Sequence, residues 1–280
     1  MRFRQRLVLS YIREKYKLLS RFSKRLTAAS AFQLFCTPQY RNRKKLPSIF
    51  EQAEVLRFSF YQYNIQGYRW NEAAEKKILI LHGFESSVIN FDRYIKPLVK
   101  KGYCVLAVDA PAHGRSSGRT VNVLLYKEFI ETIIHKYGPI TNFMAHSLGG
   151  LALSLALEEL PHDDSNKVVF IAPATETVTA IDSLFQFLQL DEKVRKEFDA
   201  IIEEKSGHSP EWFSIKRAAK NIKATVLWLH DKNDTMTPLT DVKPLIDKAY
   251  PNFTFHITEG LGHRRIYRDN KVMKVVIDFF

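Results

Sequence analysis

Ser147 lies in the run Ala145–Gly150, whose residue types suit a nucleophile. The run reads Ala-His-Ser-Leu-Gly-Gly, and it separates an apolar segment typical of a buried strand from residues 151–157, which predict a helix of small side chains. A tight turn from strand to helix holds a serine hydroxyl clear of the sheet, and it needs small residues two positions to either side. Ala145 and Gly149 meet that need. The run therefore predicts a nucleophile elbow, with alanine in place of its usual first glycine.

A histidine and an aspartate further along the chain could activate this serine. His263 ends the glycine-rich run Gly260–His263 after a predicted strand, in a loop that leaves its imidazole free to reach Ser147. Asp234 and Asp231 both follow another predicted strand, and either could be the carboxylate. A serine needs a base to remove its proton, and the base needs a carboxylate to fix its tautomer and stabilise its charge. These residue types therefore predict nucleophilic catalysis.

Three other histidines compete with His263 as the base. His146 is next to the serine at the turn, where its side chain is expected to point away from the hydroxyl. His256 lies within a predicted strand, and His113 precedes the serine in a loop that it is expected to stabilise. His263 is therefore the predicted base.

Short apolar runs predict the strands that position these residues. Residues 55–63 and 66–70 alternate in polarity and predict a hairpin, with Asn64 and Gly67 as turn residues. Continuous apolar runs follow at 78–81, 104–108, 142–145, 168–171, 226–229 and 253–257. Runs this short and this apolar are typical of strands buried on both faces of a parallel sheet.

Predicted helices alternate with these strands, at 91–101, 121–137, 148–160, 239–249 and from 270 onward. The alternation predicts an α/β fold with a doubly wound, mostly parallel sheet of eight strands. Residues 174–221 break the alternation with helix-like sequence too long for a plain crossover. They predict a helical cap over the carboxyl edge of the sheet, inserted in a main domain of residues 51–280 that follows an N-terminal basic helical arm, residues 1–50.

Taken in order, these motifs resemble the α/β-hydrolase fold family over about residues 54–280. The run Leu81–Phe84 (Leu-His-Gly-Phe) is similar to the family's H-G-aromatic motif, whose loop supplies one amide of the oxyanion hole. The resemblance implies that the backbone N–H groups of Phe84 and Leu148 form this hole. Residues 109–116 are similar to a structural loop of the family, so Asp109 and His113 are not expected to be catalytic.

The same resemblance favours Asp234 over Asp231 as the acid, because Pro238 follows Asp234 at the family's usual spacing. It also implies the catalytic order Ser147, Asp234, His263. The expected reaction is hydrolysis of a small-molecule carboxylic ester or thioester through an acyl-enzyme. Two alternatives stay open: a lipase or carbon–carbon hydrolase with an apolar substrate, and a catalytically silent binding protein of the same fold.

The positive charge of the chain is concentrated at its N-terminus. The 280 residues carry a formal charge of +12, and residues 1–45 hold 13 Lys and Arg against one acid. The rest of the chain is balanced, which argues against nucleic acid as a partner. Residues 3–29 predict one helix with apolar side chains between the bases, namely Phe3, Leu7, Tyr11, Leu18, Phe22 and Leu26. Such a helix either packs on the domain or contacts an anionic membrane surface or acidic partner through residues 1–45.

Composition and motifs limit the remaining possibilities. A hydrophobic share of 45% and a charged share of 26% are typical of a globular protein. No run resembles a signal peptide or a membrane span, and two cysteines are too few for a disulfide framework, so a cytoplasmic location is expected. No metal-ligand spacing and no phosphate loop occurs, so the chemistry is expected to need neither metal nor cofactor. Oligomeric state is not predicted.

Overall fold

The computed structural model describes the chain from Phe3 to Phe280, and its side chains from Leu9 onward. The chain folds as two compact units. The cap unit consists of the residues up to Thr37 together with Glu176–Phe213, and the sheet unit consists of Pro38–Thr175 and Ser214–Phe280. The predicted domain limits at residue 50 and at 174–221 stay predictions.

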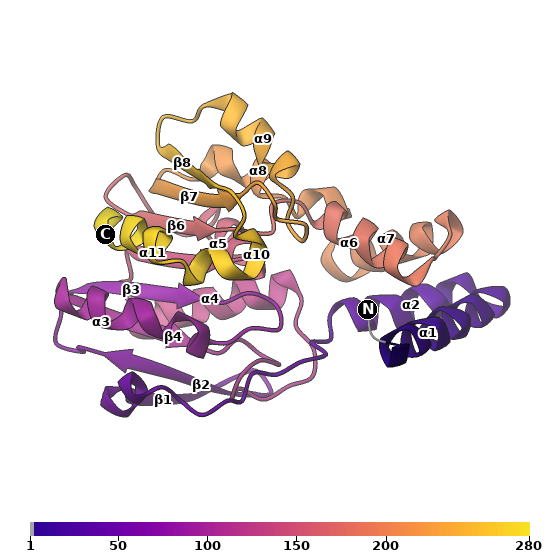
Figure 1. Ribbon diagram of the computed structural model, residues 1–280, viewed down its shortest axis with the longest axis horizontal. Coiled ribbons are helices and arrows are strands. Elements are labelled where there is room, and N and C mark those ends of the chain that lie inside the picture. The colour runs from indigo at the N-terminus through magenta and orange to yellow at the C-terminus, as the bar shows by residue number, and fades with distance from the viewer. Residues whose placement is uncertain (1–2) are drawn as a thin grey trace. The chain divides into compact units, whose positions relative to one another are not determined.

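The sheet unit contains one eight-stranded sheet (Figure 1). Its strands are β1 (Glu54–Phe60), β2 (Tyr63–Trp70), β3 (Lys76–Leu81), β4 (Tyr103–Val108), β5 (Asn142–His146), β6 (Lys167–Ile171), β7 (Thr225–Asp231) and β8 (Phe253–Thr258). Their spatial order is β1-β2-β4-β3-β5-β6-β7-β8. The pairs β1–β2 and β2–β4 are antiparallel, and all other pairs are parallel. The prediction of a doubly wound, mostly parallel eight-stranded sheet is confirmed.

Helices cover both faces of this sheet. They are α3 (Asp92–Lys100), α4 (Val123–Tyr137), α5 (Leu148–Leu157), α8 (Ile215–Ala218), α9 (Leu239–Lys248), α10 (Gly262–Arg265) and α11 (Asn270–Phe279). Strand β3 shows why its sequence must be apolar throughout. Leu79 and Leu81 pack in the core shared with α4 and α5, whereas Ile78 and Ile80 pack in the core shared with α3 and α11. Both faces of the strand are buried, as expected in a parallel sheet.

The hairpin turn lies earlier than predicted. Tyr61, with φ 49°, and Gln62 connect β1 to β2, so the prediction of Asn64 and Gly67 as turn residues is wrong. Both lie within β2, where Gly67 pairs with Val108. A Cβ atom on Gly67 would lie 2.9 Å from the Val108 side chain. This glycine is therefore explained by a close approach between strands rather than by a turn.

The basic arm forms two helices rather than the single predicted helix of residues 3–29. They are α1 (Phe3–Phe22) and α2 (Lys24–Phe35), and the helical conformation is interrupted at Ser23. Ser23 has an extended backbone, and its side chain accepts a hydrogen bond from the N–H of Leu26. A serine in this position caps the start of a helix by satisfying a free N–H group. That cap ends one helix and begins the next.

The arm packs on the cap helices α6 (Thr177–Leu188) and α7 (Glu192–Ser206), with which it forms the cap unit. The ring of Phe198 in α7 meets Phe32 and Phe35 of α2 at centroid distances of 5.8 and 5.9 Å. Lys24 forms an ion pair with Asp191 at 2.7 Å, and Arg25 pairs with two glutamates of α7. Arm and cap, about 170 residues apart in sequence, therefore share one core.

Candidate active site

Ser147 occupies a strained turn between β5 and α5. Its φ of 53° and ψ of −123° lie in a region that residues other than glycine rarely adopt. The small residues near it have a steric reason. A Cβ atom on Gly149 would lie 2.6 Å from the carbonyl oxygen of His82, and one on Gly150 would lie 2.6 Å from the side chain of Pro173. The turn has the geometry expected of a nucleophile elbow.

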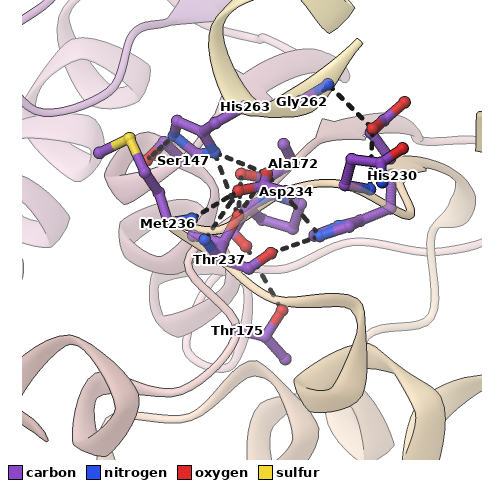
Figure 2. Close-up of polar contacts among 12 residues, drawn as sticks. Ser147, Ala172, Thr175, His230, Asp234, Met236, Thr237, Gly262 and His263 are labelled. Atoms are coloured by element: carbon purple, nitrogen blue, oxygen red, sulfur yellow. Dashed lines mark hydrogen bonds and ion pairs between the residues drawn. The ribbon is translucent and has the colours of Figure 1, made fainter. Parts of the chain in front are cut away.

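The structure brings together Ser147, His263 and Asp234 (Figure 2). The Nε2 atom of His263 lies 3.0 Å from the Oγ atom of Ser147, and its Nδ1 atom lies 2.8 Å from the Oδ2 atom of Asp234. The three side chains are buried, and they follow β5, β8 and β7 respectively. Because parallel strands end at the same edge of a sheet, three residues far apart in sequence meet there.

Four groups hold the carboxylate of Asp234. Its Oδ1 atom accepts the backbone N–H groups of Met236 and Thr237, each at 2.9 Å, and its Oδ2 atom accepts the Thr237 hydroxyl at 2.9 Å as well as His263. Burial opposes ionisation of this carboxyl. The hydrogen bond and charge of His263 and the two backbone N–H groups outweigh burial, so the pKa of Asp234 lies below its ordinary value. Asp234 is thus an anion beside the imidazole.

Thr237 contacts both Asp234 and His263, and the sequence did not predict it as a residue of the site. Its Oγ1 atom lies 3.1 Å from the Nδ1 atom of His263 and 3.4 Å from the carbonyl oxygen of Ala172. Its own carbonyl oxygen accepts a 2.6 Å hydrogen bond from the Nε2–H group of His230 (Figure 2). The one available signal was its place between Asp234 and Pro238, because residues in so short a turn must lie near the carboxylate.

Asp231, the alternative acid, has another role in the structure. Its Oδ1 atom accepts the N–H groups of Asn233 and Gly262, each at 2.9 Å. Its Oδ2 atom accepts the Thr258 hydroxyl at 2.7 Å and the N–H group of Leu261 at 3.0 Å. Asp231 therefore fixes the loop that leads into His263.

His146 lies against His263 without contacting the serine hydroxyl. Its Nε2–H group donates to the carbonyl oxygen of His263 at 3.1 Å, and the two rings are 4.7 Å apart. Its Nδ1 atom is buried and has no partner among the described residues. Burial is the main cause that holds the pKa of His146 well below its ordinary value, so the ring is neutral. His146 anchors the backbone of the predicted base, and His256 lies within β8.

Two neutral histidines shape the loop that follows β3. The Nε2 atom of His82 accepts a hydrogen bond from the N–H group of Ala110 at 3.0 Å. Its Nδ1–H group donates to the carbonyl oxygen of Gly83 at 2.8 Å. The Nε2 atom of His113 accepts the N–H group of Glu85 at 3.0 Å. Burial lowers the pKa of His82 to about 4 and that of His113 to about 3. Both rings hold the loop in place, in agreement with a structural role for His113.

The backbone of this loop lies directly against the serine. A Cβ atom on Gly83 would lie only 2.7 Å from the Cβ atom of Ser147. The next residue is Phe84, and Leu148 is the first residue of α5, where N–H groups have no partner within the helix. Neither of these two N–H groups donates to another residue in the described part of the chain. Both are therefore available to a negatively charged oxygen formed at Ser147.

The described residues contain no group of three or more His, Cys, Asp or Glu side chains placed to hold a metal ion. No residue of this site is assigned to a metal or a cofactor.

Comparison with known proteins identifies the fold. The family model described as serine aminopeptidase, S33, matches residues 72–209. The uncharacterized protein YqkD of Bacillus subtilis (strain 168) is 24% identical over 242 residues, which are 79% of this chain and 77% of YqkD. The Pyrococcus furiosus esterase Pf2001 superposes with a TM-score of 0.63 at 20% identity, over 87% of this chain and 96% of the esterase. The thioesterase domain from the curacin biosynthetic pathway gives a TM-score of 0.58 at 14% identity, over 81% and 98% of the two chains. With its eight-stranded sheet and its turn at Ser147, the chain has the α/β-hydrolase fold.

Proposed function

We propose that the protein is a serine hydrolase that cleaves a small-molecule carboxylic ester or thioester through an acyl-enzyme. One observation carries the proposal: the hydrogen-bonded series from Ser147 through His263 to Asp234, with spacings of 3.0 and 2.8 Å. Nucleophile and base lie within hydrogen-bond distance, and a third group orients the base. The match to the serine aminopeptidase model and the likeness to an esterase support a serine hydrolase as the enzyme class.

In the first step, the Nε2 atom of His263 takes the proton of Ser147 as the serine oxygen attacks the carbonyl carbon. The carbonyl oxygen becomes negatively charged and accepts hydrogen bonds from the N–H groups of Phe84 and Leu148. Asp234 stabilises the imidazolium that forms. The tetrahedral intermediate then collapses, and His263 returns the proton to the leaving alcohol or thiol. An acyl group remains on Ser147.

In the second step, His263 takes a proton from a water molecule, which attacks the acyl carbon. The same N–H groups stabilise the second oxyanion, and the proton on His263 passes to the oxygen of Ser147. The carboxylic acid leaves and the free enzyme is restored. Each step moves one proton through one imidazole nitrogen, which is what the position of His263 between serine and carboxylate allows.

The direct test is intact mass after incubation with a fluorophosphonate, which phosphonylates an activated serine. We expect one adduct on the native chain and none on Ser147→Ala. The matched control is Ser165→Ala, which removes an exposed serine and should label like the native chain. A panel of esters and thioesters then defines the substrate. An unlabelled but folded native chain would favour the silent binding protein, and a labelled Ser147→Ala variant would place the nucleophile elsewhere.

A further inference from the structure

The N-terminal helices α1 and α2 expose several large apolar side chains. Tyr11, Leu18, Phe22 and Leu26 are 73%, 55%, 80% and 61% exposed. They are four of the nine large hydrophobic side chains that are exposed in the described part of the chain, although these two helices are a small part of it. Large apolar side chains gathered on one surface commonly mark a contact with a partner.

The first three of these residues form one line along α1. Leu18 follows Tyr11 by seven residues and Phe22 follows Leu18 by four, and both spacings return to the same side of a helix. The opposite side of α1 is the one that packs: Tyr16 is buried, and its hydroxyl donates to the carbonyl oxygen of Ser30 in α2 at 3.2 Å. Folding of the cap unit therefore uses one side of α1 and leaves the line of Tyr11, Leu18 and Phe22 uncovered.

Mostly basic side chains border this line, and the one acid beside it, Glu14, forms an ion pair with Lys17 at 3.7 Å. Lys15 follows Tyr11 by four residues and Arg21 follows Leu18 by three, so each is a neighbour on the helix surface. Both are exposed and neither forms an ion pair with a described residue, whereas Lys24 and Arg25 are used in ion pairs with the cap. The sequence adds Arg2, Arg4 and Arg6, whose side chains lie outside the described ones.

We propose that the hairpin of α1 and α2 docks the protein on the surface of an anionic lipid bilayer. Tyr11, Leu18 and Phe22 would enter the boundary between headgroups and acyl chains, and Lys15 and Arg21 would meet the lipid phosphates. The strong positive charge of the arm favours an anionic surface and opposes pairing with the arm of a second copy. In the proposed contact α1 lies along the surface, with Tyr11, Leu18 and Phe22 on the side that faces the lipid. None of the described helices is both long and apolar enough to cross a membrane.

Docking of the hairpin would also hold the cap helices α6 and α7 in place, because the hairpin and these helices belong to one compact unit. The carbonyl oxygen of Phe187 in α6 accepts a 2.9 Å hydrogen bond from Arg13, and α2 packs on α7 through Phe198. A hairpin held on a bilayer therefore holds α6 and α7 at the same surface. This proposal does not rest on the proposed catalytic activity.

Flotation of the full chain with lipid vesicles tests the proposal. We expect binding to vesicles of phosphatidylcholine with about 30 mol% phosphatidylglycerol and little binding to pure phosphatidylcholine. Raising the salt from about 0.1 M to about 1 M should release the protein, because the screening length falls from about 10 to about 3 Å. Ser147→Ala should bind like the native chain, which separates docking from catalysis.

Two sets of substitutions locate the contact. The combined Tyr11→Ser, Leu18→Ser and Phe22→Ser variant should lose binding to the anionic vesicles. The combined Lys15→Gln and Arg21→Gln variant should bind the anionic vesicles more than tenfold more weakly, because each base near the surface contributes about a fivefold gain in affinity. Lys96→Gln with Lys100→Gln removes two exposed bases of α3 and is the matched control, with no expected change. The substituted positions are exposed, so circular dichroism should show native folding.

Three results would overturn the proposal. One is equal binding to neutral and anionic vesicles, or none to either. Another is unchanged vesicle binding by the two α1 variants. The third is a native dimer, seen by light scattering after size exclusion, that the apolar variant converts to a monomer, since the exposed line would then be covered by a second copy of the chain.

Discussion

The hydroxyl oxygen of Thr237 lies 3.1 Å from the Nδ1 atom of His263, on the side of the imidazole that faces Asp234. The hydroxyl donates to the Oδ2 atom of Asp234 at 2.9 Å, so its oxygen is free to accept a share of the Nδ1–H bond. Thr237 is therefore a positioning residue for the carboxylate and the imidazole together. It acts on the tautomer of His263 without contacting Ser147.

Thr237→Val should lower kcat for an ester substrate by about three- to tenfold, because it removes one hydrogen bond from each partner and keeps the side-chain shape. Thr237→Ser keeps the hydroxyl and should restore most of the rate. KM should change little, since the hydroxyl faces the acid and base. A valine variant with native kcat, measured beside the serine variant, would show that the contact has no part in catalysis.

Asp234 and Asp231 should respond differently to loss of charge. Asp234→Asn should lower kcat by about a thousandfold or more, because an amide no longer stabilises the imidazolium of His263. The change should leave folding largely intact. Steady-state kinetics and fluorophosphonate labelling rates measure the effect.

Asp231→Asn should act mainly on stability. The carboxylate accepts four hydrogen bonds from the loops at Asn233 and at 258–262, and a charged acceptor contributes about 1.5–3 kcal/mol for each bond lost. We expect a lower thermal midpoint and a smaller loss of kcat than for Asp234→Asn. If Asp231→Asn removed activity at a native midpoint while Asp234→Asn stayed active, the two roles would be reversed.

The neutral histidines near the site predict a loss of stability in mild acid. Burial lowers the pKa of His82 to about 4 and that of His113 to about 3, whereas an unfolded histidine takes up a proton near pH 6.5. Their contribution is therefore complete above about pH 6.5, and it is lost as the pH falls toward about 4 for His82 and about 3 for His113. The free energy of unfolding should fall by up to about 1.4 kcal/mol per pH unit for each histidine.

Urea unfolding between about pH 7 and pH 4.5 measures this dependence. His113→Gln keeps an acceptor for the N–H group of Glu85 and cannot take up a proton, so its slope should be shallower by about one proton. A slope equal to that of the native chain would mean that His113 is already charged in the folded state.

Local patterns were enough to predict the sheet and the position of Ser147. Each predicted strand of the parallel part is a short apolar run, and the turn at Ser147 is set by small residues next to it in sequence. Gly67 was wrongly predicted to be a turn residue. The need for glycine there comes from the close approach of Val108 in another strand, which the sequence around Gly67 does not reveal. Serine is a common helix-capping residue, so Ser23 could have indicated a helix start, but the regular apolar spacing on both sides of it favoured one continuous helix.

Contacts between distant segments could not be predicted in this way. Packing of Phe198 on Phe32 joins residues 166 positions apart, and no periodicity in either helix names its partner. The same holds for the contact of His146 with the backbone of His263. The contact of Thr237 could not be predicted for a further reason. A threonine near a proline is common in turns, and only the path of the folded chain makes this hydroxyl face the imidazole of His263.

Gly83 should be sensitive to substitution, although it contributes no side chain to the proposed catalytic group. A Cβ atom there would lie 2.7 Å from the Cβ atom of Ser147 and 2.9 Å from the Nδ1 atom of His146. Gly83→Ala must therefore displace the loop that carries the N–H group of Phe84. We expect kcat to fall by about a hundredfold, as for loss of one oxyanion donor.

Gly102→Ala is the matched control for Gly83→Ala. Gly102 has a φ of 84° and no atom within 4 Å of the added methyl group, so the substitution strains the backbone without a clash. It should cost about 1 kcal/mol of stability and leave kcat unchanged. The comparison separates a general loss of stability from a displaced oxyanion loop, with kcat and the urea midpoint measured for both. Native kcat in Gly83→Ala would mean that the loop beside Ser147 can move without affecting the reaction, and Phe84 would lose its assigned role.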